Sequence, residues 1–297
     1  MKPPPFDYHR AQSIADAMAV LAGQPDAKIL AGGQSLVPLM NLRLVHPAVL
    51  VDINPLTELD YVTLDEDGTT RVGALCRHSR LESDPQILKH QPLLSHAARH
   101  VAHPQVRARG TLGGSLAHAD PAAELPAALV ALDARVKVAG PAGRARETSV
   151  KDLVTGFLAT TLEPEEMLVE IVIPARPPQA RAAFREIAPR HGDFATAGVA
   201  VELSFDRAGR CGHAVAAGCG LSALPVDLSA AVQPLAGQAT VTEYVLREVA
   251  VNASRAFDPS EDLHASAQDR RELAAALLVE AIRAAWHNGG AADEEAT

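Results

Sequence analysis

Two short glycine-rich segments constrain this chain more than any other feature of its sequence. They read AGGQS from Ala31 to Ser35 and TLGGS from Thr111 to Ser115, about eighty residues apart. Because glycine lacks a Cβ, adjacent glycines let the backbone reach positive φ and bring consecutive N–H groups close to an anion. Two such loops that faced each other would hold a pyrophosphate from both sides. The pair therefore predicts a dinucleotide-binding site.

The first glycine segment lies between a predicted strand and a predicted helix. An apolar run over 28–31 precedes it, and residues 36–42 follow with apolar side chains at helical spacing. A second buried strand is predicted over 49–53, and Ser13 is placed to cap a helix that begins at Ile14. A loop before a helix presents unpaired N–H groups at the positive end of the helix dipole, where phosphates commonly bind. Taken alone, this order is equally typical of a tight turn without a ligand.

The second glycine segment repeats that order. A helix predicted over 93–103 is followed by an irregular link with Arg107 and Arg109, then by the glycines, and then by an Ala/Leu-rich helix over 122–132. Neither segment fits the G-x-G-x-x-G fingerprint or the P-loop. The run 218–223 imitates such a fingerprint, but a proline follows where a helix interior is required, so a turn is predicted there.

Composition and charge exclude several classes of protein. The chain has 297 residues, 47% of them apolar and 21% charged, which predicts a globular protein with two domains. No stretch approaches the ~20 apolar residues of a membrane helix, and the N-terminus lacks a signal-like apolar core, so a cytoplasmic protein is expected. The net charge of −9, with basic residues scattered singly, argues against a nucleic-acid partner.

The cysteines and histidines predict no metal site. The chain has three cysteines, Cys76, Cys211 and Cys219. They form no C-x-x-C pair and do not have the spacing of a ferredoxin. An iron–sulfur cluster in this chain is therefore excluded, and buried reduced thiols are expected. His96, His100 and His103 recur at i, i+4 and i+7 of the predicted helix, but a zinc site usually adds a carboxylate or thiolate ligand.

Several longer runs carry a resemblance to a known family. The combined pattern resembles the FAD-binding medium subunit of the molybdenum hydroxylases, the relatives of xanthine dehydrogenase and carbon monoxide dehydrogenase. The resemblance covers essentially the whole chain. The runs that carry it extend from Lys28 to Asp52, His103 to Leu129, Glu163 to Pro174, Phe184 to Leu203 and Asp262 to Ala274.

The resemblance implies an α+β fold with two domains. A two-lobed vanillyl-alcohol-oxidase-like (PCMH-type) FAD-binding domain is expected over 1–175, with α/β lobes at about 1–55 and 56–175. A C-terminal domain like that of the CO dehydrogenase flavoproteins is expected over 179–288, built from a small antiparallel sheet and helices, and 289–297 is expected to be disordered. The pattern itself predicts strands over 168–173, 182–187, 195–205 and 213–221, and helices over 242–256 and 270–287.

The resemblance also assigns cofactor-binding residues, but no catalytic residue and no metal ligand. Both glycine segments would bind the FAD pyrophosphate and nearby ribityl and ribose hydroxyls, and the turn 190–194 would lie near the flavin ring. This chain has Glu124 where relatives have Asp, Arg185 where one branch has Lys, and Ser115 where Asn or Asp is frequent. The full predicted set is Ile29, Leu30, Ala31, Gly32, Gly33, Gln34, Ser35, Leu36, Val101, Thr111, Leu112, Gly113, Gly114, Ser115, Asp120, Glu124, Leu168 and Arg185.

The implied function is electron transfer within a complex. FAD held here would take electrons from iron–sulfur clusters of a small partner subunit and pass them to an external acceptor. Substrate would be hydroxylated at the molybdopterin cofactor of a large subunit, within a dimer of heterotrimers. Two alternatives stay open, a stand-alone FAD-dependent oxidoreductase of the same fold and a non-catalytic assembly subunit. An alternative for Glu124 is that it only complements its helix N-terminus, and Arg107 and Arg109 could lie on a solvated surface or meet a partner.

Overall fold

The N-terminal lobe is a small parallel sheet with its crossover helices. In the computed structural model, which describes residues 2–259 and 261–287, the strands are in the order β1-β3-β2. The elements are β1 (Asp7–Arg10), α1 (Ile14–Gly23), β2 (Ala27–Leu30), α2 (Leu36–Asn41) and β3 (Val49–Asp52). The Ser13 side chain accepts a hydrogen bond from the Asp16 N–H at 3.1 Å, so the predicted N-cap of α1 is confirmed. Parallel pairing brings the carboxyl ends of β2 and β3 to one edge, where the first glycine segment begins.

The second lobe is an antiparallel sheet covered by helices. Its strands are in the order β4-β5-β10-β6-β7. They are β4 (Val62–Leu64), β5 (Thr70–Gly73), β6 (Arg135–Ala139), β7 (Ala145–Ser149) and β10 (Met167–Ile173), with a small hairpin of β8 (Val154–Gly156) and β9 (Ala159–Thr160). The helices are α3 (His78–Ser83), α4 (Pro85–His90), α5 (Pro92–His100), α6 (Pro104–Arg107), α7 (Leu112–His118), α8 (Glu124–Ala131) and α9 (Val150–Leu153), with 3₁₀ turns at Thr57–Leu59 and Pro141–Gly143.

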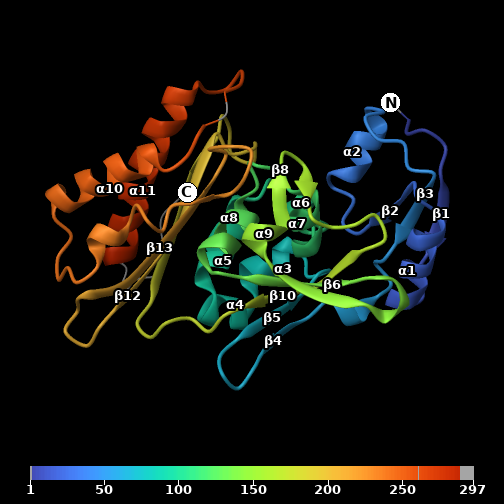
Figure 1. Ribbon diagram of the computed structural model, residues 1–297, viewed down its shortest axis with the longest axis horizontal. Helices are drawn as coiled ribbons and strands as arrows, with labels where there is room; N and C mark the ends of the chain where they lie inside the picture. Colours follow the sequence, from blue (N-terminus) through green and yellow to red (C-terminus); the bar gives the residue numbers. More distant parts are fainter. Residues whose placement is uncertain (1, 260, 288–297) are drawn as a thin grey trace.

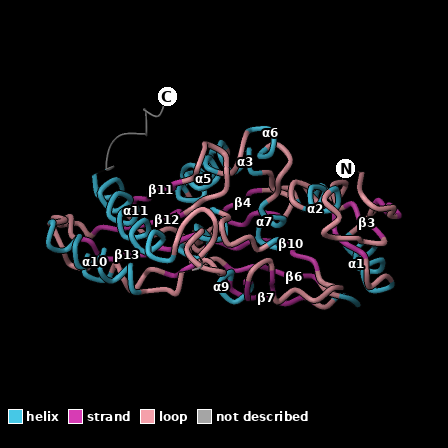
Figure 2. The backbone as a smooth tube through the Cα atoms, turned by 90° about the horizontal axis from the view of Figure 1, so that it is seen from above, coloured by secondary structure: helices cyan, strands magenta, loops and turns pink. Residues whose placement is uncertain are grey.

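The C-terminal part places a sheet between two helical layers. Figure 1 shows this part at the opposite end of the molecule from the N-terminal lobe, with the second lobe between them. Figure 2 shows the same arrangement from above. Its sheet has the order β11-β12-β13-β14, with α5 and α8 packed against one face and α11 against the other. The elements are β11 (Arg181–Ile187), β12 (Ala197–Phe205), β13 (Cys211–Cys219), β14 (Val226–Asp227), a 3₁₀ turn (Gln233–Leu235), α10 (Glu243–Arg255) and α11 (Ala267–His287). Every residue of β12 is buried because both faces of the strand are covered.

The predicted fold class and most predicted elements are confirmed. The chain pairs α/β lobes with a C-terminal unit of sheet and helices. The run 218–223 ends β13 and turns at Gly220, whose φ is +68°, so the turn predicted there is confirmed. Residues 174–180 contain no helix or strand and link the two parts, while the predicted domain boundaries stay a prediction. The expected disorder over 289–297 lies outside the described residues.

Two predictions around the second glycine segment are partly wrong, although the helix itself is present as α5. The helix predicted over 93–103 ends at His100, because Val101 is extended and Ala102 has a φ of +44°. The predicted irregular link contains the short helix α6 (Pro104–Arg107), which Pro104 begins, since proline suits the first helical turn.

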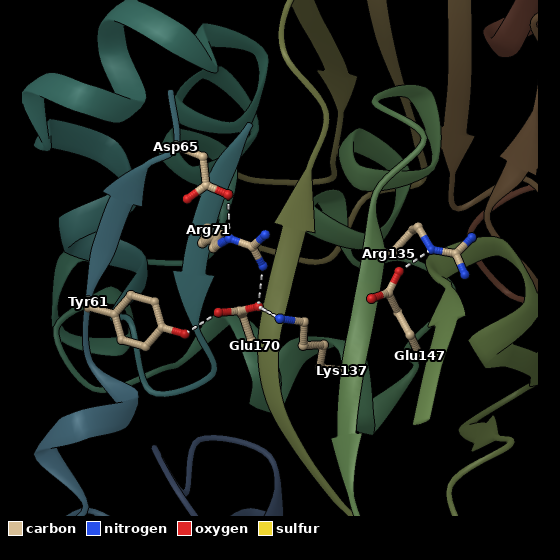
Figure 3. A network of polar contacts seen from close by, with 7 residues as sticks. All are labelled: Tyr61, Asp65, Arg71, Arg135, Lys137, Glu147 and Glu170. Atoms are coloured by element: carbon tan, nitrogen blue, oxygen red, sulfur yellow. Dashed lines mark hydrogen bonds and ion pairs between the residues drawn. The ribbon is translucent and has the colours of Figure 1, made fainter. Parts of the chain in front are cut away.

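A carboxylate network joins three strands of the second lobe. Glu170 of β10 accepts hydrogen bonds from the Tyr61 hydroxyl at 2.5 Å and from Arg71 Nη1 at 2.9 Å, and it lies 2.7 Å from Lys137 Nζ (Figure 3). Burial alone would raise the pKa of Glu170, but the donors Lys137, Tyr61 and Arg71 lower it below its ordinary value. The ionised form of Glu170 therefore holds β5, β10 and β6 together at neutral pH.

Replacing Glu170 with Ala is expected to lower the free energy of unfolding by about 2–4 kcal/mol, because three donors lose their shared, largely buried acceptor. Glu147→Ala is the matched control, since it breaks the exposed Arg135–Glu147 pair of the same sheet (Figure 3) and should cost about 1 kcal/mol or less. Denaturant titration of both variants measures the difference. Equal losses would contradict a special role for Glu170.

Candidate cofactor site

A cavity lies at the edge where β2 and β3 end. Its volume is about 490 Å³, and the first glycine segment forms much of its wall. Asp52 and Asn54 at the end of β3 and Arg109 of the second lobe also line it. The Asp52 carboxylate accepts hydrogen bonds from the Tyr8 hydroxyl and from the backbone N–H of Asn54 at 3.0 Å. Both lobes therefore contribute to one cavity.

The first glycine segment offers unpaired backbone donors to this cavity. Gly33 has a φ of +71°, so the positive φ predicted for this segment is confirmed there. Within the described residues, the backbone N–H groups of Gly32, Gly33 and Gln34 donate no hydrogen bond to the protein. The Gln34 side chain instead donates to the Gly32 carbonyl at 3.0 Å, which steadies the turn. Consecutive N–H groups in this arrangement form a concave site for an anion.

The two glycine segments meet through their backbones. A Cβ built on Gly32 would overlap the carbonyl oxygen of Arg109 and lie 2.8 Å from Cα of Gly110. Gly110 in turn lies against the buried ring of His78, since its Cβ would be 2.8 Å from Nδ1. Burial lowers the pKa of His78 to about 4, so this ring is neutral at pH 7. Both positions require glycine because two chain segments approach each other too closely there to leave room for a Cβ.

The second glycine segment differs from its predicted form. Gly113 and Gly114 lie in the first turn of α7, so the predicted open loop with positive φ is wrong at this position. Thr111 caps the helix by accepting the Gly114 N–H at 3.1 Å. The N–H groups of Leu112 and Gly113 donate to the carbonyls of Cys76 and Ala74 at 2.9 Å each. The N–H groups of residues 112–115 thus donate within the protein, whereas the first segment offers three consecutive N–H groups without an acceptor.

A half-buried arginine that the sequence analysis did not identify joins the two lobes at the cavity. Arg77 precedes α3 and donates to Asn54 Oδ1 and to the carbonyl oxygen of Arg109, each at 2.6 Å. Asn54 in turn donates to the carbonyl oxygen of Ala31 at 2.8 Å. No local motif signals this role, because Arg77 and its partners come from three separate stretches of sequence.

A second polar cluster lies between the second lobe and the C-terminal sheet. Glu124 begins α8 with only 7% of its surface exposed, and burial, followed by the nearby Asp120 charge, raises its pKa to about 7. Burial and then the charge of Glu124 raise the pKa of Glu186 on β11 to about 8. Glu186 Oε2 is buried and has no hydrogen-bond partner within the described residues. Two carboxyl groups without a counter-charge favour keeping at least one proton at neutral pH.

The remaining predicted residues are distributed over both domains. Ile29 and Leu30 lie on β2, Leu168 is buried on β10, and Val101 follows the end of α5. Arg185 on β11 donates to the Phe184 carbonyl at 2.9 Å. Ser35 precedes α2 without a capping side-chain bond, Leu36 begins α2, Ser115 lies in α7, and Asp120 accepts the Ala122 N–H at 2.9 Å. Their assignment to a cofactor stays a prediction.

The basic and histidine residues of the second lobe are placed differently from the expectation. Arg107 is buried and pairs with Glu82 at 2.9 Å, so both readings considered for it, solvated surface and partner contact, are wrong. His103 lies outside α5 and stacks on His191, with ring centroids 6.1 Å apart. Within the described residues no three of His, Cys, Asp and Glu gather in a way that would hold a metal ion.

Comparison with known proteins shows what this arrangement belongs to. A family model described as the FAD binding domain in molybdopterin dehydrogenase matches residues 4–176, and one for the CO dehydrogenase flavoprotein C-terminal domain matches 182–285. The chain belongs to this family of FAD-binding subunits.

Several members of the family match along nearly their whole length. The alpha subunit of the 6-hydroxypseudooxynicotine dehydrogenase complex of Paenarthrobacter nicotinovorans is 40% identical, covering 97% of this chain and 96% of its own. The carbon monoxide dehydrogenase medium chain of Hydrogenophaga pseudoflava is 36% identical over 96% and 99%. The structure of quinoline 2-oxidoreductase from Pseudomonas putida 86 matches with a TM-score of 0.90 and 37% identity, over 96% of this chain and 98% of that one.

The first glycine segment suits the diphosphate of FAD. A dinucleotide diphosphate needs several donors that the protein does not already use, and the first glycine segment supplies them at a cavity of about 490 Å³. FAD is the cofactor of the family.

Gly32→Ala is expected to reduce the FAD content of the purified subunit and to lower its thermal stability, by about 1–3 kcal/mol, because the new Cβ forces the Arg109 backbone away. Gly23→Ala is the matched control, since nothing lies within 4 Å of its Cβ. The ratio of FAD to protein and the unfolding curve measure the effect. Full FAD content with unchanged stability in the Gly32 variant would contradict the close-approach assignment.

Glu186→Gln tests the buried carboxyl pair through pH. A raised pKa in the folded state means that stability present at low pH is lost as pH rises through about 8. The flavin-free wild-type protein should therefore lose stability between pH 6 and pH 9, and the Gln variant should lose about 2 kcal/mol less. Glu66→Gln, at an exposed position, should follow the wild type. If the stability of wild type and of the Glu186 variant depended on pH in the same way, this pair would be excluded as the source of the pH-dependent loss of stability.

Proposed function

We propose that this chain is the electron-transfer subunit of a molybdenum hydroxylase. It holds FAD, receives electrons from iron–sulfur clusters of a small partner subunit and delivers them to an external acceptor. Oxidation of the substrate takes place at the molybdenum cofactor of a large partner subunit. The observation that carries this proposal is the set of unpaired N–H groups of Gly32, Gly33 and Gln34 at a two-lobed cavity, within a stretch that matches the FAD-binding family.

In this proposal the cofactor supplies the redox chemistry and the protein supplies its position. When bound, FAD exchanges electrons singly or in pairs and so connects one-electron clusters to a two-electron acceptor. The protein supplies position: the first glycine segment receives the diphosphate, and the Arg77–Asn54 contact keeps the two lobes together. The raised pKa values of Glu124 and Glu186 favour a proton retained between the second lobe and the C-terminal sheet.

The choice of substrate belongs to a partner in this proposal. Similar chains are named for dehydrogenases of caffeine, carbon monoxide and 6-hydroxypseudooxynicotine, three chemically unrelated molecules. Their sequence identity to this chain nevertheless lies in one narrow band, from 36% to 40%. Such similar chains in dehydrogenases of different substrates support a role in electron transfer, with substrate recognition in a partner subunit.

The proposed assembly is a dimer of heterotrimers in the cytoplasm, with one large molybdenum subunit and one small iron–sulfur subunit beside each copy of this chain. Relatives named as a medium chain and as a complex subunit support partners of this kind. Within residues 2–259 and 261–287, no helix combines the length and the hydropathy needed to span a bilayer.

Co-expression with the genes of candidate large and small subunits tests the proposal. The chain is expected to purify with bound FAD, to co-elute with a molybdenum-containing and an iron–sulfur partner, and to have its flavin reduced by substrate only when both partners are present. A single-chain enzyme that oxidises a substrate alone would favour the stand-alone oxidoreductase. A colourless chain that assembles with its partners would favour the non-catalytic assembly subunit.

A further inference from the structure

Two arginines without a paired carboxylate lie next to each other at the edge of the cavity. Arg109 lines the cavity and its side chain is exposed, while Arg77 is half-buried and donates to the Arg109 carbonyl oxygen. Within residues 2–259 and 261–287, neither side chain forms an ion pair with Asp or Glu. Two positive charges are thus gathered at a place that also holds unpaired N–H donors.

The electrostatics of Arg77 show that the two charges interact. Burial lowers its pKa first, and the positive charge of Arg109 lowers it further, while Asp60 and Asp52 act in the opposite direction. Neither acid is available as a direct partner. Asp60 pairs with Arg80 at 3.2 Å, and Asp52 accepts from Tyr8 and from the backbone and side chain of Asn54. Like charges held together in a partly buried site favour the binding of an anion between them.

The other buried or half-buried arginines of the second lobe are paired with carboxylates. Arg71 pairs with Glu170, Arg80 with Asp84, and Arg107 with Glu82, at distances between 2.9 and 3.1 Å. Arg77 is therefore a half-buried arginine without a carboxylate partner, and Arg109 beside it also has none; Arg99 has no ion pair either, but it is exposed on α5 and does not line the cavity. The exception coincides with the unpaired N–H groups of Gly32, Gly33 and Gln34.

We propose that Arg77 and Arg109 supply the counter-charges for the FAD diphosphate, so that anion recognition is shared between the N–H groups of the first lobe and the guanidinium groups of the second. This inference rests on the proposed function. It assigns a binding role to two residues outside both glycine segments. It also explains how a second glycine segment with its own N–H groups occupied still belongs to a diphosphate site, because it positions the Arg109 backbone against Gly32.

The experiment compares flavins that differ only in phosphate. Apoprotein is titrated with FAD, which carries a diphosphate, and with riboflavin, which carries none, for wild type, Arg109→Gln and Arg77→Gln. FAD affinity is expected to fall by about tenfold or more in each variant, because charge-assisted hydrogen bonds are lost, while riboflavin affinity stays within about twofold. Arg109→Lys should recover part of the FAD affinity, since it restores the charge without the planar fork.

Controls separate charge at the cavity from other effects. Arg99→Gln makes the same change in net charge at an exposed position on α5 and should bind FAD as the wild type does. The dependence of FAD affinity on salt should become shallower in Arg109→Gln than in wild type. Arg109→Gln is the decisive variant, because it keeps the backbone carbonyl that Arg77 and Gly32 contact.

Three outcomes would overturn the inference. Unchanged FAD affinity in Arg109→Gln would show that this guanidinium does not contribute to FAD binding. An equal loss of affinity for FAD and riboflavin would indicate a general structural role. Competition by inorganic pyrophosphate that is identical in wild type and Arg109→Gln would place the anion elsewhere. If wild-type apoprotein bound no FAD at all, the proposed function itself would fail, a result distinct from these three.

Discussion

The contact between the backbones of Gly32 and Arg109 is the constraint on which the cofactor site depends. It brings a loop of the parallel lobe against the segment that precedes α7 in the antiparallel lobe, with no room for a Cβ between them. Because the lobes meet there, the unpaired N–H groups of one and Arg109 of the other line the same cavity, and Arg77 contacts the cavity residues Asn54 and Arg109. Any change that separates these backbones disperses the donors and removes the anion site.

Polar groups without a local partner concentrate in two regions of the molecule. Unpaired positive charge and free N–H donors gather at the N-terminal cavity, while two buried carboxyl groups without a counter-charge lie between α8 and β11. Structural charges are instead neutralised locally, as in the network around Glu170. A folded chain tolerates uncompensated groups mainly where a ligand or a shared proton completes them, so this division identifies functional regions.

Sequence patterns predicted the parts of this structure that local physics determines. The N-cap at Ser13, six of the strands (β2, β3 and β10 to β13) and the first glycine segment follow from capping, periodicity and the absence of a Cβ. The open loop predicted at the second glycine segment was wrong, because Thr111 caps a helix whose first turn contains both glycines. A pair of glycines does not signal such a cap. Arg77 and Glu186 were missed because their significance depends on which residues, distant in sequence, lie opposite them.

The most direct test of the central claim is a crystal structure of the chain with FAD bound. The account predicts diphosphate oxygens within about 3 Å of the N–H groups of Gly33 and Gln34 on one side and of the Arg109 guanidinium on the other. A diphosphate bound against α7 alone, with the Gly32–Gln34 N–H groups and both arginines facing water, would contradict it.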